Sequence, residues 1–566
     1  MSLKAKFSYL ESFTRSLTKA AFLVGMLSLL ASLLGMVRDR MLAGTFGAGA
    51  ELDIYYAAFR VPDFFFNTIL VGITSSAFLP VLTEYLHKPG KRGERKTTGS
   101  PFDFPKGAQD FINSLVSTLL VGLLFLSVIL FFIAPIFTDL IAPGFTQEQK
   151  EATVLLTRIM LLSPFFLSFS GVLGNILNIR KYFFFYSLAP VIYNLGAIIA
   201  IIFFVPSMGV AGLAWGISLG AFCHMMMQFL PAKVLGLKLN WRLNPRHPGI
   251  IRVIKMMIPR SVHLGVLQLN LIATTFLAST LPVGSLTVFN FANNLQSVPL
   301  GLFGASFAIA AFPALSIMAA KKQKKEFRDE FSSIMCKILF FIIPLSAILI
   351  ILRAQIVRLI LGSGKFDWED TILTFNVLGI LALSLFAQSL NILFVRAFFA
   401  IHDTITPLKS GIIGLIVNVG TAILIVKEWS CIAPFVEKST SCAGVKAPIV
   451  GLALAYTFSQ IATFFFLLIG LSKYLKGMKI KAIKSSLVKI ALSTLLMGAV
   501  VQIIKWVFGV FFPLSTFISV ATQVSLCSLF GIAIYLLICK TLKCKELTEL
   551  YNECPKIFGR KNCPRQ

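Results

Sequence analysis

The chain is built from long apolar stretches that carry no charge. Ala20–Val37, for example, contains no charged side chain. A stretch of about 18 or more apolar residues is long enough to cross the hydrocarbon core of a membrane as a helix. About fourteen such stretches follow one another along the 566 residues. The sequence therefore predicts an all-α polytopic membrane protein with about fourteen transmembrane helices.

The expected spans are the longest apolar runs between charged or turn-forming segments. We expect the first span to be a retained helix, because no clear small-residue cleavage site follows it. The expected spans are residues 19–46, 51–86, 107–139, 149–178, 182–205, 209–231, 249–281, 284–319, 329–352, 371–398, 407–426, 450–472, 485–511 and 515–539.

The positive charge is distributed in a way that indicates membrane topology. The formal net charge is +28. With the N-terminus inside, roughly 35 Lys and Arg lie in cytoplasmic segments and roughly 8 in external loops, as the positive-inside rule requires. An even number of spans also places the C-terminus in the cytoplasm. Anionic membrane lipids account for this charge, so we expect no nucleic-acid partner.

Four short strings recur in the same order in the two halves of the chain. NILNIR (175–180) matches NILFVR (391–396), and AFLPVLT (77–83) matches AFPALS (311–316). The loop APGF (142–145) resembles GSGKF (362–366), and GLAWG (212–216) matches GLALA (451–455). The repeat pairs spans 1–6 with spans 7–12. Since six is even, both halves have the same orientation, which makes them parallel repeats typical of transporters.

The repeat predicts three parts. We expect an N-lobe at residues 1–240, a C-lobe at 241–476, and two further helices with a basic cytoplasmic tail at 477–566. Two lobes facing each other would leave a central cavity, which alternating access would open to each side of the membrane in turn.

Polar residues concentrate in the first two spans of each repeat. Charged side chains within spans are costly, so they usually face a hydrated interior and mark function. Asp53 and Arg60 are seven residues apart and share one helix face. Several arginines in a cavity favour an anion, since a guanidinium suits phosphate. The candidate substrate-binding residues are Arg38, Asp39, Asp53, Arg60, Arg260, Asn293 and Asn294.

Motifs for other chemistry do not appear in the sequence. We find no phosphate-binding GxxxxGK[ST] loop, no HExxH and no nucleophile elbow, so we expect neither an enzyme nor a cofactor or metal site. Cys431 and Cys442 share one external loop, where a disulfide and two free thiols are both compatible with the sequence.

The opening residues resemble a known family. SLLGMVRDRMLAGTFGAGAELDIYYAAFRVPDFFF (32–66) and SSAFLPVLTEY (75–85) are similar to the start of the MurJ (MviN) family of bacterial lipid II flippases. The resemblance continues through the APGF, GNILN, GLAW and GSGKF strings. It implies a fold of the multidrug/oligosaccharidyl-lipid/polysaccharide exporter (MOP) superfamily, which is MATE-like, in the bacterial cytoplasmic membrane.

The resemblance also implies a substrate and partners. The substrate would be lipid II, undecaprenyl-pyrophosphate carrying the peptidoglycan precursor, moved from the inner to the outer leaflet. In the family, spans 13 and 14 help to form an apolar groove for the polyprenyl tail. Peptidoglycan synthases are candidate protein partners.

This chain departs from the family pattern at several cationic positions. Leu33 follows Ser32 where the family usually has Arg, and Asn293–Asn294 replaces an Asp-Arg pair. We expect Arg60 and Arg260 to substitute for the missing cations. Spans 7, 11 and 12 contain no Asp or Glu, so we do not expect the sodium site of some family members.

Three other functions fit part of the pattern. A flippase for another polyprenyl-linked oligosaccharide would share the cavity and its cations. A MATE-type drug or cation antiporter would need more acidic groups in the cavity. A scaffold for wall-synthesis enzymes would explain the Asn and Gln residues through helix packing, but it would not explain buried arginines.

Overall fold

The computed structural model is helical throughout its described part, with no strand among these residues. It describes residues 17–70, 78–87, 104–234, 236–427, 448–475, 477, 480–514, 516–549 and 551. The pair Cys431 and Cys442 lies outside these ranges, so a disulfide and two free thiols both remain compatible with the sequence. Five cysteines within them are free thiols, namely Cys223, Cys336, Cys527, Cys539 and Cys544.

Residue contacts divide the chain into two compact units. Unit 1 comprises residues 1–42 and 49–286, and unit 2 comprises 43–48 and 287–566. Helix α2 (Leu17–Phe46) contributes residues to both units. The other helices of unit 1 are α3 (Ala50–Phe65), η1 (Phe66–Leu70), α5 (Phe78–His87), α6 (Lys106–Ile141), α7 (Gln147–Met160), α8 (Leu162–Ile179), α9 (Phe183–Phe203), α10 (Val205–Met208), α11 (Val210–Val234) and α12 (Pro248–Ser279).

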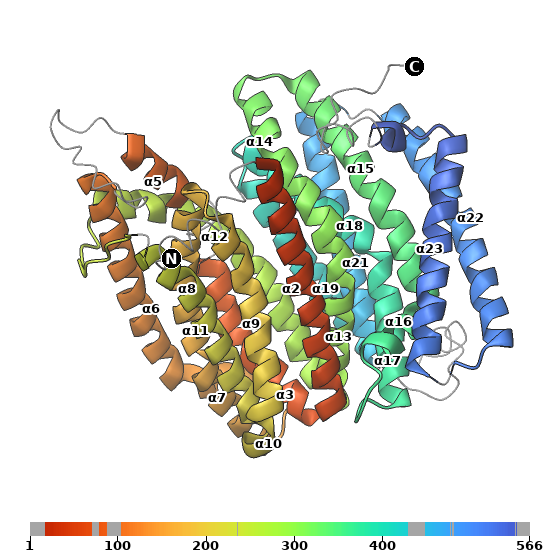
Figure 1. Cartoon of the computed structure of the whole chain (residues 1–566), viewed down its shortest axis with the longest axis horizontal. Helices are drawn as coiled ribbons and strands as arrows, with labels where there is room; N and C mark the ends of the chain where they lie inside the picture. Colours follow the sequence, from red (N-terminus) through yellow and green to blue (C-terminus); the bar gives the residue numbers. More distant parts are fainter. Residues whose placement is uncertain are drawn as a thin grey trace, which may run out of the picture. The chain divides into compact units, whose positions relative to one another are not determined.

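Unit 2 holds the remaining helices. They are α13 (Ser285–Pro299), η2 (Leu300–Ala305), α14 (Ser306–Ala320), α15 (Lys324–Ile351), α16 (Arg353–Ile360), α17 (Trp368–Leu383), α18 (Leu385–Ala400), α19 (Ile405–Lys427), α21 (Pro448–Tyr474), α22 (Ile480–Phe511) and α23 (Phe517–Thr541). The last two lie side by side and pack against each other (Figure 1). Helix α22 also packs on α15. Their outer faces expose large apolar side chains to lipid, such as Leu495, Trp506 and Ile518.

Eleven helices of the described chain are long and apolar enough to cross a membrane, and twelve if a bent pair is one span. That pair is α17 and α18, which meet at 48°. The first two expected spans are present as α2 and α3–η1 but fall outside this count. The all-α membrane architecture is therefore confirmed, while the number fourteen stays a prediction.

In both sequence repeats the fourth expected span is divided into two helices. In unit 1, α7 and α8 are separated at Leu161, three residues before Pro164, which cannot donate a backbone hydrogen bond. In unit 2, α17 and α18 are separated at Ser384, whose hydroxyl is bound both to Leu381 and to the Gln388 amide. The matched strings NILNIR and NILFVR lie in the second half of each broken helix.

Both repeats also contain a π-helix in their second span. Segment η1 follows α3, and η2 follows α13. A proline precedes each one, Pro62 within α3 and Pro299 at the end of α13. A π-helix is rare and often marks a functional segment. The presence of a π-helix at equivalent positions supports the parallel repeat independently of the matched sequence strings.

Two loops bind the ends of helices from the opposite repeat. In unit 1 the backbone N–H of Gly144, between α6 and α7, donates to Ser279 Oγ at the end of α12 over 3.3 Å. In unit 2 the backbone N–H of Lys365, between α16 and α17, donates to the Gly44 carbonyl in α2 over 2.9 Å. The first helix of each repeat is thus held at one end by the other repeat's loop. The boundaries of the contact units therefore differ from those of the sequence repeats. The predicted division into an N-lobe (1–240), a C-lobe (241–476) and a C-terminal part (477–566) stays a prediction.

Candidate functional site

The candidate site lies in unit 1 around the charged end of α2. Arg38 donates from Nε and Nη2 to Asp39 Oδ1, over 3.0 and 2.8 Å. The Arg38 side chain is 23% exposed, whereas the Asp39 side chain is 7% exposed. The carboxylate is therefore covered, and the guanidinium is the more accessible member of the pair.

Asn194 of α9 fixes this part of α2. Its Oδ1 accepts from Arg38 Nη1 over 3.2 Å, and its Nδ2 donates to the Ala31 carbonyl over 3.1 Å. Gly35 faces the same amide, and a Cβ there would touch Asn194 Oδ1 at 3.9 Å. One amide thus positions both the backbone of α2 and the guanidinium of Arg38.

Three tyrosines surround the ion pair. Tyr55 and Tyr56 of α3 and Tyr193 of α9 all interact electrostatically with Arg38. The rings of Tyr55 and Tyr56 meet edge to face with centroids 5.2 Å apart. Phenol hydroxyls both donate and accept hydrogen bonds, so they suit the oxygens of a phosphate or a sugar.

Arg60 is buried one helical turn beyond Tyr56, with 9% of its surface exposed. Its Nε donates to Thr275 Oγ1 of α12 over 2.8 Å. Asp63 interacts electrostatically with Arg60 and accepts from Asn67 Nδ2 over 2.8 Å. Both Arg60 and Arg38 interact with Tyr56, so the structure brings these two arginines into one electrostatic cluster.

Asp53 is held away from this cluster. It lies in the first turn of α3, about 10 Å along the helix from Arg60. Its Oδ2 accepts from the Gly284 backbone N–H over 2.7 Å, in the turn that follows α12. Gly284 has φ +88°, a conformation that glycine adopts readily. This contact gives Asp53 a structural role in fixing the turn.

Arg260 lies elsewhere on α12. It follows Pro259 and is half-buried. Thr275, which binds Arg60, is about 22 Å further along the same helix at 1.5 Å per residue. Arg260 and Arg60 therefore belong to different levels of the membrane, and one phosphate group does not span both.

Asn293 and Asn294 belong to unit 2, on α13. Asn293 Oδ1 accepts from Gln296 Nε2 over 3.0 Å, and Gln296 Oε1 accepts from Gln388 Nε2 over 3.3 Å. Ser297 Oγ donates to the Asn294 carbonyl over 2.7 Å. Asn293 therefore belongs to an amide chain that joins α13 to α18.

The cluster presents hydrogen-bond donors rather than a large net charge. The formal charges of Arg38, Asp39, Arg60 and Asp63 cancel. The bonds to Asp39 and Asn194 use three of the five N–H groups of Arg38, and a planar guanidinium can offer the other two to an oxyanion. Within the described ranges no three His, Cys, Asp or Glu side chains are grouped to hold a metal ion.

Sequence reasoning missed the neutral part of the cluster. Tyr56 precedes Arg60 by four residues and so shares its helix face, a signal that was readable in the sequence. Asn194 is a polar residue in an otherwise apolar span, which also indicates an intramembrane partner. The pairing of Arg60 with Thr275 joins residues 215 positions apart and has no local signal.

The family model and the similar sequences carry the same family description. The model of the family described as lipid II flippase MurJ matches residues 42–522. A probable lipid II flippase MurJ of Haemophilus influenzae is 28% identical over 484 residues, covering 84% of this chain and 90% of the relative. Another from Vibrio cholerae is 28% identical over 408 residues, covering 72% of this chain and 77% of the relative.

Solved structures share the fold. A lipid II flippase MurJ in an inward closed conformation superposes with a TM-score of 0.72 at 24% identity, covering 92% of this chain and 98% of that one. An inward-facing MATE family transporter of the MOP superfamily gives a TM-score of 0.61 at 15% identity, covering 79% and 95%. The MATE-like fold expected from the sequence is confirmed.

Proposed function

Because this chain belongs to the lipid II flippase MurJ family, we propose that it binds the anionic headgroup of lipid II through the Arg38 cluster of unit 1. The protein is a lipid flippase, a multi-pass membrane transporter and not an enzyme. Its substrate is lipid II, and the family match favours this over another polyprenyl-linked oligosaccharide or a MATE-type substrate. Movement runs from the inner to the outer leaflet by alternating access, with the polyprenyl tail remaining in lipid.

Arg38 is the residue that carries the proposal. It is the more exposed member of its ion pair, and Asp39 and Asn194 fix its orientation. A pyrophosphate oxygen pair would accept from its two remaining N–H groups, a geometry that a planar fork provides and an ammonium does not. The nearby tyrosine hydroxyls would contact further phosphate or sugar oxygens.

Arg60 and Arg260 have separate parts in this proposal. Arg60 is buried and donates a hydrogen bond to Thr275, and it acts on the substrate site through its electrostatic field. Arg260 lies in the half of α12 nearer its basic start, where it would meet the headgroup at an earlier stage of transport. Asp53, Asn293 and Asn294 hold helix and turn geometry, and contact of these three with substrate stays a prediction.

The membrane setting completes the proposal. We place the protein in the bacterial cytoplasmic membrane with both termini in the cytoplasm, because the basic loops lie on one side of the expected spans. Peptidoglycan synthases, which consume the flipped lipid, are proposed partners.

The test is lipid II flipping in liposomes that contain the purified full-length chain. We expect Arg38→Ala to lower the flipping rate by about tenfold or more, since charge-assisted hydrogen bonds contribute about 1.5–3 kcal/mol. Arg38→Lys should recover only part of the rate. The control is Arg158→Ala, because Arg158 donates to the Phe131 carbonyl and stacks on that ring away from the cluster.

Two further measurements separate the roles of the arginines. Arg260→Ala should slow flipping although it leaves the Arg38 cluster intact. Complementation of a strain depleted of its lipid II flippase should be weakened by the same variants that slow flipping in liposomes. A normal flipping rate of Arg38→Ala at normal expression would contradict the proposal that Arg38 binds the headgroup. An equal loss of flipping in Arg158→Ala would show that the defect comes from a general effect on folding.

A further inference from the structure

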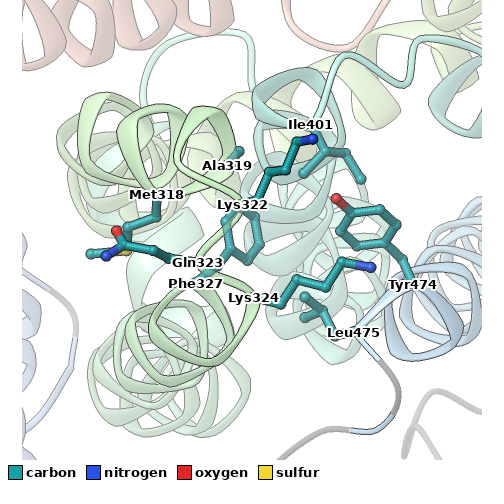
Figure 2. A pocket seen from close by; sticks show the side chains of 9 residues that line it. All are labelled: Met318, Ala319, Lys322, Gln323, Lys324, Phe327, Ile401, Tyr474 and Leu475. Carbon is teal, nitrogen blue, oxygen red and sulfur yellow. The ribbon is translucent and has the colours of Figure 1, made fainter.

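A small pocket lies at one end of unit 2, where the ends of α14, α18 and α21 meet the start of α15 (Figure 2). It is formed by the turn between α14 and α15, the end of α18 and the end of α21. The lining residues are Met318, Ala319, Lys322, Gln323, Lys324, Phe327, Ile401, Tyr474 and Leu475. We call it the lysine pocket.

The lysine pocket contains two cations and no acid among its lining residues. Lys322 lies in the turn between α14 and α15, and Lys324, two residues later, is the first residue of α15. Lys322 has φ +56°, a left-handed conformation that is uncommon for a residue with a side chain. Both lysines are exposed and both line this hollow, so their two ammonium groups are available to one ligand at its mouth.

Tyr474 orients one of these cations. The Lys324 ammonium lies 4.5 Å from the centroid of the Tyr474 ring, in cation–π contact. In Figure 2 the Tyr474 hydroxyl and the ammonium ends of Lys322 and Lys324 gather on one side of the pocket, while Gln323 extends to the other. Two ammonium groups and a phenol hydroxyl are a donor set for a phosphate.

Apolar side chains also lie at and near this donor set. Phe327 and Leu475 form the buried floor of the pocket, with 2% and 4% of their surface exposed. Within one or two helical turns of the lining residues, Ile317, Ile405 and Ile469 are exposed. A ligand with a phosphate and an acyl chain would find complementary surface for both parts.

We propose that the lysine pocket binds the headgroup phosphate of an anionic phospholipid from the cytoplasmic leaflet. The basic loops place this end of unit 2 on the cytoplasmic side, and basic pockets between membrane helices on that side bind anionic lipid headgroups. The phosphate lies between Lys322, Lys324 and the Tyr474 hydroxyl, and an acyl chain follows the exposed aliphatic face. The bound lipid joins the ends of α14, α18 and α21.

The same loop offers a matched control. Lys321 and Lys325 are exposed neighbours in this segment that do not line the pocket. If the four lysines only set topology, removal of either pair should have the same effect on lipid binding. If the pocket binds a phosphate, only Lys322 and Lys324 matter.

The experiment measures phospholipid binding by the purified full-length protein with native mass spectrometry. Phosphatidylglycerol, phosphatidylcholine with the same acyl chains, and inorganic phosphate are the three probes. We expect K322Q/K324Q to weaken the tightest phosphatidylglycerol binding roughly 25-fold, at about fivefold for each lysine near a membrane surface. K321Q/K325Q, which loses the same charge, should change it less than twofold, and phosphatidylcholine should be unaffected.

A second variant protects the test against misfolding. Tyr474→Leu removes the ring under Lys324 without changing charge, and it should weaken phosphatidylglycerol binding more than Tyr474→Phe does, at an unchanged unfolding temperature. Equal losses in the two double-lysine variants would overturn the proposal. Binding of inorganic phosphate with the affinity of phosphatidylglycerol would overturn the lipid as its occupant.

Discussion

The loop of unit 2 that binds the end of α2 depends on a glycine, and its replacement gives a sharp test. Gly364 has φ +57°, and a Cβ there would fall well inside contact distance of the Gly44 carbonyl. The neighbouring hydrogen bond from Lys365 N–H to the same carbonyl is 2.9 Å long. The substitution Gly364→Ala therefore strains the backbone and pushes α2 away from the loop.

The expected cost has three separable parts. A side chain in the left-handed conformation costs about 1 kcal/mol. Loss of the Lys365 hydrogen bond adds about 1 kcal/mol, and the displaced packing adds about the same again, which gives about 3 kcal/mol. Gly209 is the matched control, because it also has φ +57° but no atom within 4 Å of the added Cβ. Gly209→Ala should cost only the first part, about 1 kcal/mol.

The assay is reversible unfolding of the purified chain in mixed micelles, followed by helix content. We expect Gly364→Ala to lower the free energy of unfolding by about 2 kcal/mol more than Gly209→Ala does. The same variant should also flip lipid II more slowly, because the end of α2 near Arg38 loses its support. If Gly364→Ala and Gly209→Ala lowered the free energy of unfolding equally, the claim that this loop holds the end of α2 would be refuted.

Three further predictions concern other parts of the fold. Burial lowers the pKa of His247, whose Nδ1 accepts from the Gly249 backbone N–H at the start of α12. The unfolded chain then binds the proton more readily, so stability should fall as pH drops below about 6.5, and His247→Asn, an uncharged cap, should show a flatter pH profile of unfolding temperature. Tyr535→Phe removes a buried 2.8 Å bond to a carbonyl of α15 and should lower the free energy of unfolding by about 1 kcal/mol in the same micelle titration. Gly220→Leu should disrupt the close packing of α9 on α11 and lower the folded yield, whereas Gly122→Leu, with no atom within 4 Å of an added Cβ, should leave it unchanged.

The membrane architecture was predictable because lipid leaves few alternatives. An uncharged run such as Ala20–Val37 has to satisfy its backbone internally, so a helix follows from length and composition. The repeat could also be recognised in the sequence, because equivalent positions in the two halves carry similar residues. The breaks at Leu161 and Ser384 were not predicted, because they depend on how each half-helix packs and on single polar or proline residues.

The candidate site was predictable in part. Arg38 and Asp39 were identified because a charged side chain inside a span is costly and usually functional. The structure places them with Arg60 around Tyr56. The separation of Arg260 from them was not predicted, because membership of the same helix bundle does not fix depth along a helix. The exchange of helix ends between repeats was equally invisible, since the hydrogen bond from Lys365 to Gly44 joins positions more than 300 residues apart.

The π-helix η2 has a consequence for movement, because it leads directly into α14. A π turn holds one residue more than an α turn. If that residue passed into the following turn, every side chain of α14 would rotate by about 100° about the helix axis. A slip of one residue at η2 would therefore redirect whole rows of side chains without unwinding α14.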